Sequence, residues 1–202
     1  RETVRLVEAA GFDRVIVETV GVGQSETLVA EMTDVFLLLI APGGGDELQG
    51  VKRGIMEIAD LVVVNKADGR LREAAEATRA DYAGALRLLR RRPGDPEGIP
   101  AALTASALTG EGIEALIARI EALDAWRRET GWRDERRRAQ AVSAFERALV
   151  EGVREAFAAD PRVAGALGEM RAAVAAGDAL PEAAAERLVA RVFGGGREGQ
   201  TS

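Results

Sequence analysis

The chain has 202 residues and a formal net charge of -6, with 47% hydrophobic and 30% charged residues. These proportions are enough to bury a core, so the chain is not a disordered segment. It contains no cysteine and no histidine, which excludes disulfides, thiol nucleophiles, imidazole bases and the usual zinc ligands. Any chemistry must therefore use carboxylates, amines, guanidinium groups, hydroxyls, amides and the backbone.

The acidic charge is concentrated in the first third of the chain. Residues 1–69 carry 6 basic and 12 acidic side chains, whereas residues 70–202 carry 21 of each. A nucleic-acid-binding domain would show a basic surplus, so we expect no nucleic-acid partner. The longest apolar run, residues 35–40, is too short to cross a membrane, and no signal-peptide pattern opens the chain. We therefore expect a cytoplasmic protein without a membrane partner.

Helical and strand patterns alternate over the first 126 residues. Short apolar runs rich in β-branched residues predict strands over residues 14–18, 35–40, 61–64 and 101–104. Apolar spacing of three and four residues predicts helices over residues 1–10, 47–58, 71–90 and 112–123. Strands that are apolar on both faces and separated by helices are typical of a buried parallel sheet. The expected fold class is therefore α/β, a three-layer structure with a mostly parallel sheet.

The strand pattern stops beyond residue 126, where we place a domain boundary. The remainder predicts an all-α extension with helices over residues 133–158, 161–176 and 181–193. Asp160-Pro161 and Gly177-Asp178 separate these helices, because proline begins a helix well and glycine ends one. The last segment, residues 194–202, opens with three glycines and is expected to be disordered.

A polar tetrad, Asn65-Lys66-Ala67-Asp68, follows the third predicted strand. Open parallel sheets bind ligands at the carboxyl ends of their strands. The carboxylate of Asp68 can accept hydrogen bonds from the ring N1–H and the exocyclic amine of guanine, whereas adenine would leave it unpaired. Lys66 can lie along the base and ribose, and Asn65 can tie neighbouring loops together. The tetrad predicts a guanine site, and a merely polar strand exit is the alternative.

A loop of small residues follows the fourth predicted strand and enters the next helix. Its residues Ser106, Ala107 and Leu108 can bring backbone N–H groups to the carbonyl side of a guanine. Because the tetrad and this loop follow successive strands of the predicted sheet, we expect them to meet at one edge of the sheet. The combination favours a guanine-binding site over a polar strand exit.

An acidic residue and a glycine, Glu18 and Gly21, follow the first predicted strand. In nucleotide triphosphatases an acid at this position holds Mg²⁺, often through water, and a glycine amide approaches the γ-phosphate. An acid followed by a tight turn is also common elsewhere. Together with the downstream tetrad, however, these residues have the order along the chain that GTPases show.

A glycine-rich loop, residues 42–45, precedes the helix predicted over 47–58. Asp46 can cap the amino end of that helix, and Glu47 is the first residue of the helix. Gln49 and Lys52 are three residues apart, so they lie on one side of it. We interpret residues 46–52 as a switch segment that contacts a partner protein. The same segment can bring Lys52, or Gln49 through a water molecule, to the phosphates of the nucleotide. Gln24 is a rival for orienting the attacking water, and a plain glycine-rich connector is the alternative to the whole interpretation.

Residues 12–68 contain three segments that closely resemble the MeaB/ArgK group of SIMIBI-class P-loop GTPases: VETVGVGQSE, APGGGDELQGVKRGIMEIAD and VVVNKAD. In that group Glu replaces the usual Asp of the third GTPase motif. Its members are G-protein chaperones of adenosylcobalamin-dependent mutases, chiefly methylmalonyl-CoA mutase. The resemblance implies GTP or GDP and Mg²⁺ as cofactors, an acyl-CoA mutase as partner and dimerisation through the helical extension.

One motif of that group does not occur in this sequence. No Gly-x-x-x-x-Gly-Lys-Ser/Thr is present, and no Gly-Lys dipeptide. The family carries this phosphate-binding loop upstream of the resembling segment. We therefore expect residues 1–126 to be the C-terminal portion of a GTPase domain, with its third, fourth and fifth motifs, and expect this chain alone to hydrolyse GTP poorly.

The extension itself predicts a homodimer. One apolar stripe recurs every four residues at Ala141, Phe145, Leu149, Val153 and Phe157, and a second lies at Val163, Leu167, Met170 and Val174. We expect these stripes to bury each other and a second copy across a two-fold axis. A monomer in which the helices fold back on the GTPase domain stays open.

Six arginines lie at the start of the extension: Arg127, Arg128, Arg133, Arg136, Arg137 and Arg138. Glu129, Asp134 and Glu135 are interleaved with them, which favours a solvated helix face over a nucleic-acid patch. Trp126 and Trp132 are expected to anchor the extension to the GTPase domain.

Two other function classes stay open. A metal-insertion GTPase of the nickel-chaperone type would need cysteine or histidine to carry its metal, and this sequence has neither. A non-enzymatic interaction or dimerisation module would need no nucleotide.

Overall fold

The computed structural model describes residues 2–19, 26–43, 53–89, 92 and 95–193. It divides into two compact units, Arg1–Gln140 and Ala141–Ser202. The expected disordered tail, residues 194–202, and the first part of the helix expected over 47–58 lie outside the described residues. Within the described part, no helix is long and apolar enough to span a bilayer.

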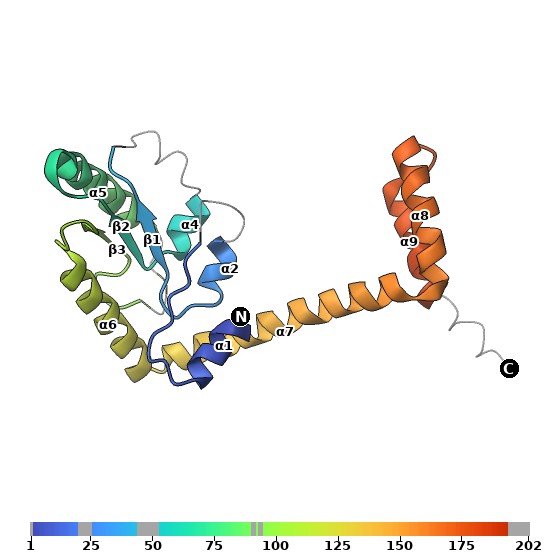
Figure 1. Ribbon diagram of the computed structural model, residues 1–202, viewed down its shortest axis with the longest axis horizontal. Coiled ribbons are helices and arrows are strands. Elements are labelled where there is room, and N and C mark those ends of the chain that lie inside the picture. The colour runs from blue at the N-terminus through green and yellow to red at the C-terminus, as the bar shows by residue number, and fades with distance from the viewer. Residues whose placement is uncertain (1, 20–25, 44–52, 90–91, 93–94, 194–202) are drawn as a thin grey trace. The chain divides into compact units, whose positions relative to one another are not determined.

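A parallel sheet forms the centre of the first unit (Figure 1). Its strands lie in the order β1 (Leu37–Ile40), β2 (Leu61–Val64) and β3 (Ala101–Thr104). All of β2 is buried, as expected for a strand covered on both faces and flanked on both sides. The strands predicted over 61–64 and 101–104 are confirmed, and β1 occupies most of the run 35–40.

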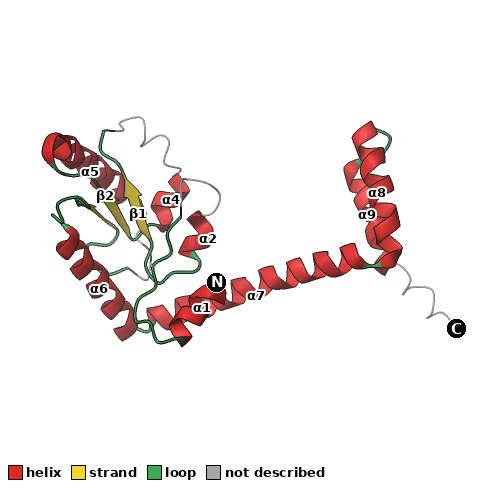
Figure 2. Cartoon of the chain, in the orientation of Figure 1, coloured by secondary structure: helices red, strands yellow, loops and turns green. Residues whose placement is uncertain are grey.

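Helices cover both faces of this sheet (Figure 2). Those that pack with Val62 on one face are α2 (Glu26–Ala30), α4 (Arg53–Ile58) and α5 (Arg72–Arg87). On the other face, Leu116 and Leu123 of α6 (Ile113–Glu129) pack with Val63. Neighbouring residues of β2 therefore face different layers, as the two-residue repeat of a strand requires. The three-layer α/β class predicted from the sequence is confirmed.

A short helix, α1 (Glu2–Ala9), opens the first unit, and residues 14–18 follow it without forming a strand. Val15 and Val17 are half-buried, while Ile16 is 92% exposed. The strand predicted there from a short apolar run rich in β-branched residues was wrong, because such a run reports a tendency to be buried and not backbone pairing. In the described part of the sheet, no strand pairs with this segment.

The second unit is helical, as predicted. Its elements are the later part of α7 (Trp132–Ala159), α8 (Pro161–Ala176) and α9 (Pro181–Phe193). The Asp160 carboxylate caps α8 by accepting the Arg162 N–H at 2.8 Å. Val163 and Leu188 are buried between α8 and α9, with Leu167 and Met170 against them. Much of the second predicted stripe is therefore covered inside this unit.

A buried charge network joins the end of α6 to the amino end of the sheet. Arg127 is 1% exposed, donates to the two Asp60 oxygens at 2.6 and 3.0 Å and donates to the Asp34 carbonyl at 2.6 Å. Arg92 donates to Asp60 at 2.6 Å and to Asp95 at 2.7 Å. The loops that precede all three strands thus meet at one guanidinium–carboxylate cluster.

The first turns of α7 also belong to the first unit. Arg136 donates to the Ala30 carbonyl at 2.9 Å, Arg137 donates to Asp34 at 2.8 and 2.5 Å, and Gln140 donates to the Thr33 carbonyl at 3.0 Å. These contacts explain why the unit extends through Gln140, beyond the boundary expected near residue 126.

The solvated face expected for the arginine cluster is therefore wrong for Arg127, which is buried, and holds only in part for Arg133, Arg136 and Arg137, which are half-buried. The Trp132 ring lies 4.6 Å from the guanidinium of Arg127 and 5.2 Å from that of Arg136. Two guanidinium groups stacked on one indole fix the start of α7 within the first unit. The expected anchoring role of Trp132 agrees with this arrangement.

We predict that Asp60→Asn lowers the free energy of unfolding at pH 7 by about 3–5 kcal/mol, because it leaves buried guanidinium groups without their carboxylate. Burial alone would raise the pKa of Asp60, but the hydrogen bond and charge of Arg127, the Phe36 N–H and Arg92 hold it below its ordinary value. The stabilisation is therefore present at neutral pH and is lost as the pH falls below about 4 through the folded-state pKa.

Urea denaturation of the unmodified protein and of Asp60→Asn at pH 7 and pH 3 checks this prediction. The difference between their free energies of unfolding should shrink at the lower pH. Asp81→Asn, an exposed aspartate on α5, is the control and should change little. A loss of stability from Asp60→Asn that is no larger than the control's would contradict the role assigned to the network.

Candidate functional site

Two loops leave the carboxyl ends of the neighbouring strands β2 and β3, and backbone hydrogen bonds hold them together. The Ala105 N–H donates to the Val64 carbonyl at 2.9 Å, and the Ala67 N–H donates to the Ala105 carbonyl at 3.1 Å. On the other side of β2, the Asn65 N–H donates to the Ile40 carbonyl at 2.9 Å. The ladder between strands thus continues into the loops, at the edge where open α/β sheets bind ligands.

Asn65 fixes both loops through one side-chain oxygen. Its Oδ1 accepts the Lys66 N–H at 2.8 Å and the Ala107 N–H at 3.1 Å. Lys66 has a φ of 59°, and among the described residues no other residue except glycine has a positive φ. A left-handed lysine costs about 1–3 kcal/mol, and such strain persists where the surroundings hold it in place. Asn65 supplies part of that constraint, in agreement with the tie between loops expected of it.

Asp68 is oriented by a buried hydroxyl from the other loop. The Ser106 Oγ donates to Asp68 Oδ1 at 2.6 Å and accepts the Thr109 N–H at 3.1 Å. Ser106 is 0% exposed, whereas Asp68 is half-buried. A carboxylate has about four acceptor positions, so this bond leaves capacity for a ligand's N–H groups. The loops therefore bring together a directed carboxylate, a strained lysine and an amide.

The remaining predicted base contacts lie at the rim of these loops. Ala107 and Leu108 are exposed, with Leu108 86% exposed. Because the Ala107 N–H already donates to Asn65, its use by a base requires that bond to be shared or released. Lys66 is exposed too, and its methylene stem is accessible to a flat ligand. The structure brings all six predicted base-site residues, 65, 66, 68 and 106–108, to these two loops.

The predicted metal and catalytic residues are less fully described. Glu18 is exposed, and among the described residues no group of three or more metal-ligating side chains occurs. Mg²⁺ needs only one or two protein carboxylates when phosphates and water supply its other ligands, so a single Glu18 fits that requirement. The other predicted residues, Gly21, Gln24, Asp46, Glu47, Gln49 and Lys52, lie outside the described part of the chain.

Two side-chain contacts beside these loops carried no signal in the sequence. Arg72 donates to both carboxylate oxygens of Glu111, at 2.6 and 2.5 Å, across 39 positions of sequence. Glu76 accepts the hydroxyl of Thr104 at 3.0 Å. Each partner is an ordinary surface residue type, so only the fold shows that they meet.

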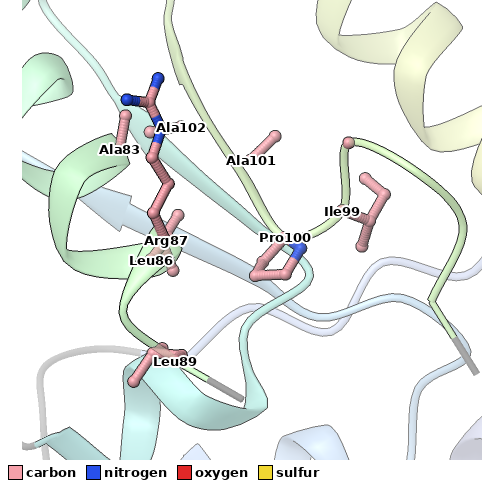
Figure 3. Close-up of a pocket in the computed structure, with 9 residues that line it drawn as sticks. Ala83, Leu86, Arg87, Leu89, Ile99, Pro100, Ala101 and Ala102 are labelled. Carbon is pink, nitrogen blue, oxygen red and sulfur yellow. The ribbon is translucent and has the colours of Figure 1, made fainter. Parts of the chain in front are cut away.

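A hollow of about 430 Å³ lies at the amino end of β3, away from these loops (Figure 3). Leu86, Arg87 and Leu89 line one side, and Ile99, Pro100 and Ala101 line the other. None of the predicted site residues lines this hollow. The loops at the carboxyl ends of β2 and β3 therefore stay the stronger candidate site.

Comparisons with known proteins identify the family of the chain. The family model described as "Methylmalonyl Co-A mutase-associated GTPase MeaB" matches residues 1–162. The chain is 53% identical over 116 residues to the GTPase ArgK of Escherichia coli, covering 57% of the chain and 34% of that protein. It is 40% identical over 188 residues to the mouse "Methylmalonic aciduria type A homolog, mitochondrial", covering 93% of the chain and 45% of that protein.

A solved structure is also similar. The crystal structure of an LAO/AO transport system kinase matches with a TM-score of 0.72 and 35% identity, covering 95% of this chain and 61% of that one. The chain spans about half the length of the curated relatives that it matches.

We predict that Gly112→Ala distorts the second loop and lowers the free energy of unfolding by about 2–4 kcal/mol. Gly112 has a φ of 78°, and an added Cβ would lie 2.5 Å from the Thr104 carbonyl oxygen. Gly110 has a φ of 80° with nothing within 4 Å of an added Cβ, so Gly110→Ala is the matched control and should cost only about 1–2 kcal/mol of backbone strain. Equal losses in chemical denaturation would show that the close contact is unimportant.

Proposed function

Because the chain belongs to the family of methylmalonyl-CoA mutase-associated GTPases, we propose that it forms the base-recognition part of a GTP-binding and GTP-hydrolysing chaperone. That chaperone gates cofactor loading or protection of an adenosylcobalamin-dependent acyl-CoA mutase. The observation that carries the proposal is the Asp68 carboxylate, held at 2.6 Å by the buried Ser106 hydroxyl at the carboxyl end of β2.

The base is recognised by hydrogen bonds that match guanine. The Asp68 carboxylate accepts from the ring N1–H and the exocyclic amine, and each charge-assisted bond contributes about 1.5–3 kcal/mol. Adenine has neither donor in that arrangement, so it would leave a fixed carboxylate unpaired and bind more weakly. Lys66 covers the base with its methylene stem. Asn65 keeps the loop that carries Ser106, Ala107 and Leu108 beside the carbonyl edge.

The phosphates and their Mg²⁺ are bound by residues in two segments of the sequence, 18–24 and 49–52. Glu18 contributes a carboxylate to Mg²⁺, which neutralises charge on the phosphates when bound. Gly21 approaches the γ-phosphate. Lys52 stabilises the phosphates or Gln49 orients water, with Gln24 as the rival for the second role. These assignments rest on the sequence pattern and on the family.

The mutase is recognised by the switch, residues 46–52, with Asp46, Glu47, Gln49 and Lys52 as its contacts. The family's description names a mutase association, and a relative bears the name methylmalonic aciduria type A homolog. Both support a mutase as the partner. A switch that also lies near the phosphates would make the affinity for the mutase depend on whether GTP or GDP is bound.

Homodimerisation through α7 is the remaining part of the proposal. Phe145, Leu149 and Val153 are 65%, 54% and 51% exposed, respectively. An apolar stripe of this length on one helix is costly in water and suits burial against a second copy. Phe157 continues the stripe but already packs against the core of α8 and α9.

We predict that Asp68→Asn weakens GTP binding by about 2–4 kcal/mol and favours xanthosine triphosphate, whose 2-oxo group accepts from the new amide. Calorimetric titration with both nucleotides checks this. Asp81→Asn on α5 is the control and should leave both affinities unchanged. Unaltered GTP affinity in Asp68→Asn would remove the tetrad from the base site.

The same variant tests the partner. Co-sedimentation with methylmalonyl-CoA mutase should differ between GTP and GDP for the unmodified protein. In Asp68→Asn, xanthosine nucleotides should reproduce that difference and guanosine nucleotides should not. Mutase association that ignores the nucleotide in both proteins would overturn the proposed gating.

We also predict that Phe145→Glu combined with Leu149→Glu gives a monomer that still binds GTP, because two buried carboxylates would be unpaired at the dimer contact. Light scattering measures the mass. Glu151→Ala changes an exposed side chain on the opposite side of α7 and should leave the dimer intact. An unmodified protein that is monomeric at micromolar concentration would contradict the dimer.

A further inference from the structure

Arg72 and Glu76 lie one turn apart at the start of α5, so they are on the same side of the helix. The helix begins directly after the short 3₁₀ turn Gly69–Leu71, which itself follows Asp68. The start of α5 is therefore joined to the first loop of the base site through the backbone. The side chains of Arg72 and Glu76 contact residues at the two ends of the second loop.

Arg72 contacts the last residue of the second loop, which follows β3 and comprises residues 105–111. Its guanidinium donates to both oxygens of Glu111, at 2.6 and 2.5 Å. The backbone carbonyl of Glu111 in turn accepts the Ser106 N–H at 2.8 Å. Because the Ser106 hydroxyl donates to Asp68 at 2.6 Å, a short chain of contacts runs from α5 to the carboxylate of the base site.

Glu76 holds the near end of the same loop. It accepts the Thr104 hydroxyl at 3.0 Å, and Thr104 is the last residue of β3. Arg79 donates to Glu76 at 2.8 Å. The hydrogen bond from Arg79, and then that from Thr104, lower the pKa of Glu76 below its ordinary value, and Arg72 does the same for Glu111. Both carboxylates therefore stay ionised at neutral pH.

These contacts are poorly suited to stabilising the fold. The side chains of Arg72 and Glu111 are 55% and 53% exposed, and exposed pairs contribute little to global stability. The bidentate geometry instead restricts direction, because a guanidinium and a carboxylate with two parallel bonds share one plane. Fixing both ends of a loop seven residues long, 105–111, restricts where Ser106 can lie.

We propose that Arg72 and Glu76 are positioning residues for guanine recognition, which brace both ends of the 105–111 loop so that Ser106 orients Asp68. This inference rests on the proposed function, since it concerns the affinity and selectivity of the same site. Neither residue touches the base. Their effect appears in how well the site distinguishes guanine from a base that lacks the exocyclic amine.

The test measures the affinities of the purified protein for GDP and for inosine diphosphate, which lacks that amine. The variants are Arg72→Ala, Glu111→Ala, the double alanine variant and the exchanged pair Arg72→Glu with Glu111→Arg. Arg154→Ala is the matched control, because Arg154 and Glu151 form a similarly exposed pair in the second unit, with side chains 67% and 54% exposed. Thermal unfolding of each variant is measured in parallel.

We expect each single variant to bind GDP about three- to tenfold more weakly, with a smaller preference for GDP over inosine diphosphate and an unchanged unfolding midpoint. The double variant should lose no more than either single one, because both remove the same contact. The exchanged pair should recover at least part of the affinity. Glu76→Gln should lower selectivity as well, since it weakens the brace at Thr104.

Two results would overturn the inference. One is that the unmodified protein prefers GDP over inosine diphosphate and that the variants at Arg72, Glu76 and Glu111 all keep the same preference. The other is a loss that follows the unfolding midpoint and is matched by Arg154→Ala, which would make the pair merely structural. An unmodified protein that binds GDP no better than ADP would instead contradict the proposed function.

Discussion

The ion pair between Asp60 and Arg127 anchors the strand on which the site depends. Asp60 directly precedes β2, and its two oxygens accept from Arg127 while one of them also accepts from Arg92. A buried pair of this kind gives little net stability over an apolar core, but losing one partner is costly. Its value here is geometric: it fixes the amino end of β2, and four fully buried residues later the same strand presents Asn65.

The carboxyl end of β2 is built from contacts that are individually small. The Asn65 side chain holds two backbone N–H groups, Lys66 keeps a left-handed conformation, and Ser106 directs Asp68. Each bond contributes about 0.5–1.5 kcal/mol, so none of them determines the fold. Together they fix the direction of one carboxylate, which a site for a flat base requires. A buried ion pair thus fixes one end of the strand, and the recognition site lies at the other end.

The sequence predicted those features that short-range patterns encode. β2 and β3 were located to the residue, the helices of the second unit nearly so, and the tetrad 65–68 was placed at a strand's carboxyl end. Patterns failed where the partner is distant. The burial of Arg127 depends on Asp60, 67 positions away, and the Arg72–Glu111 contact spans 39 positions. Local charge alternation is the same for a solvated arginine and for one that meets a remote carboxylate.

The strand expected at residues 14–18 shows a related limit. The apolar, β-branched run over residues 15–17 suggested a strand, but pairing depends on a neighbouring backbone that no local window contains. The first compact unit extends past the boundary expected near residue 126, because Arg136, Arg137 and Gln140 contact α2 and the chain just beyond it. Long-range polar contacts therefore decided both the extent of the first unit and the geometry of the site.

The most direct test of the account is an amide-resolved NMR titration of the protein with GDP and, separately, with ADP. We predict that GDP shifts the amide signals of Lys66, Ser106 and Leu108, that ADP does so far less, and that the signal of Ala101, beside the hollow at the amino end of β3, is unaffected by either nucleotide. Equal shifts with both nucleotides, or GDP shifts confined to the hollow, would contradict the claim that the loops after β2 and β3 recognise guanine.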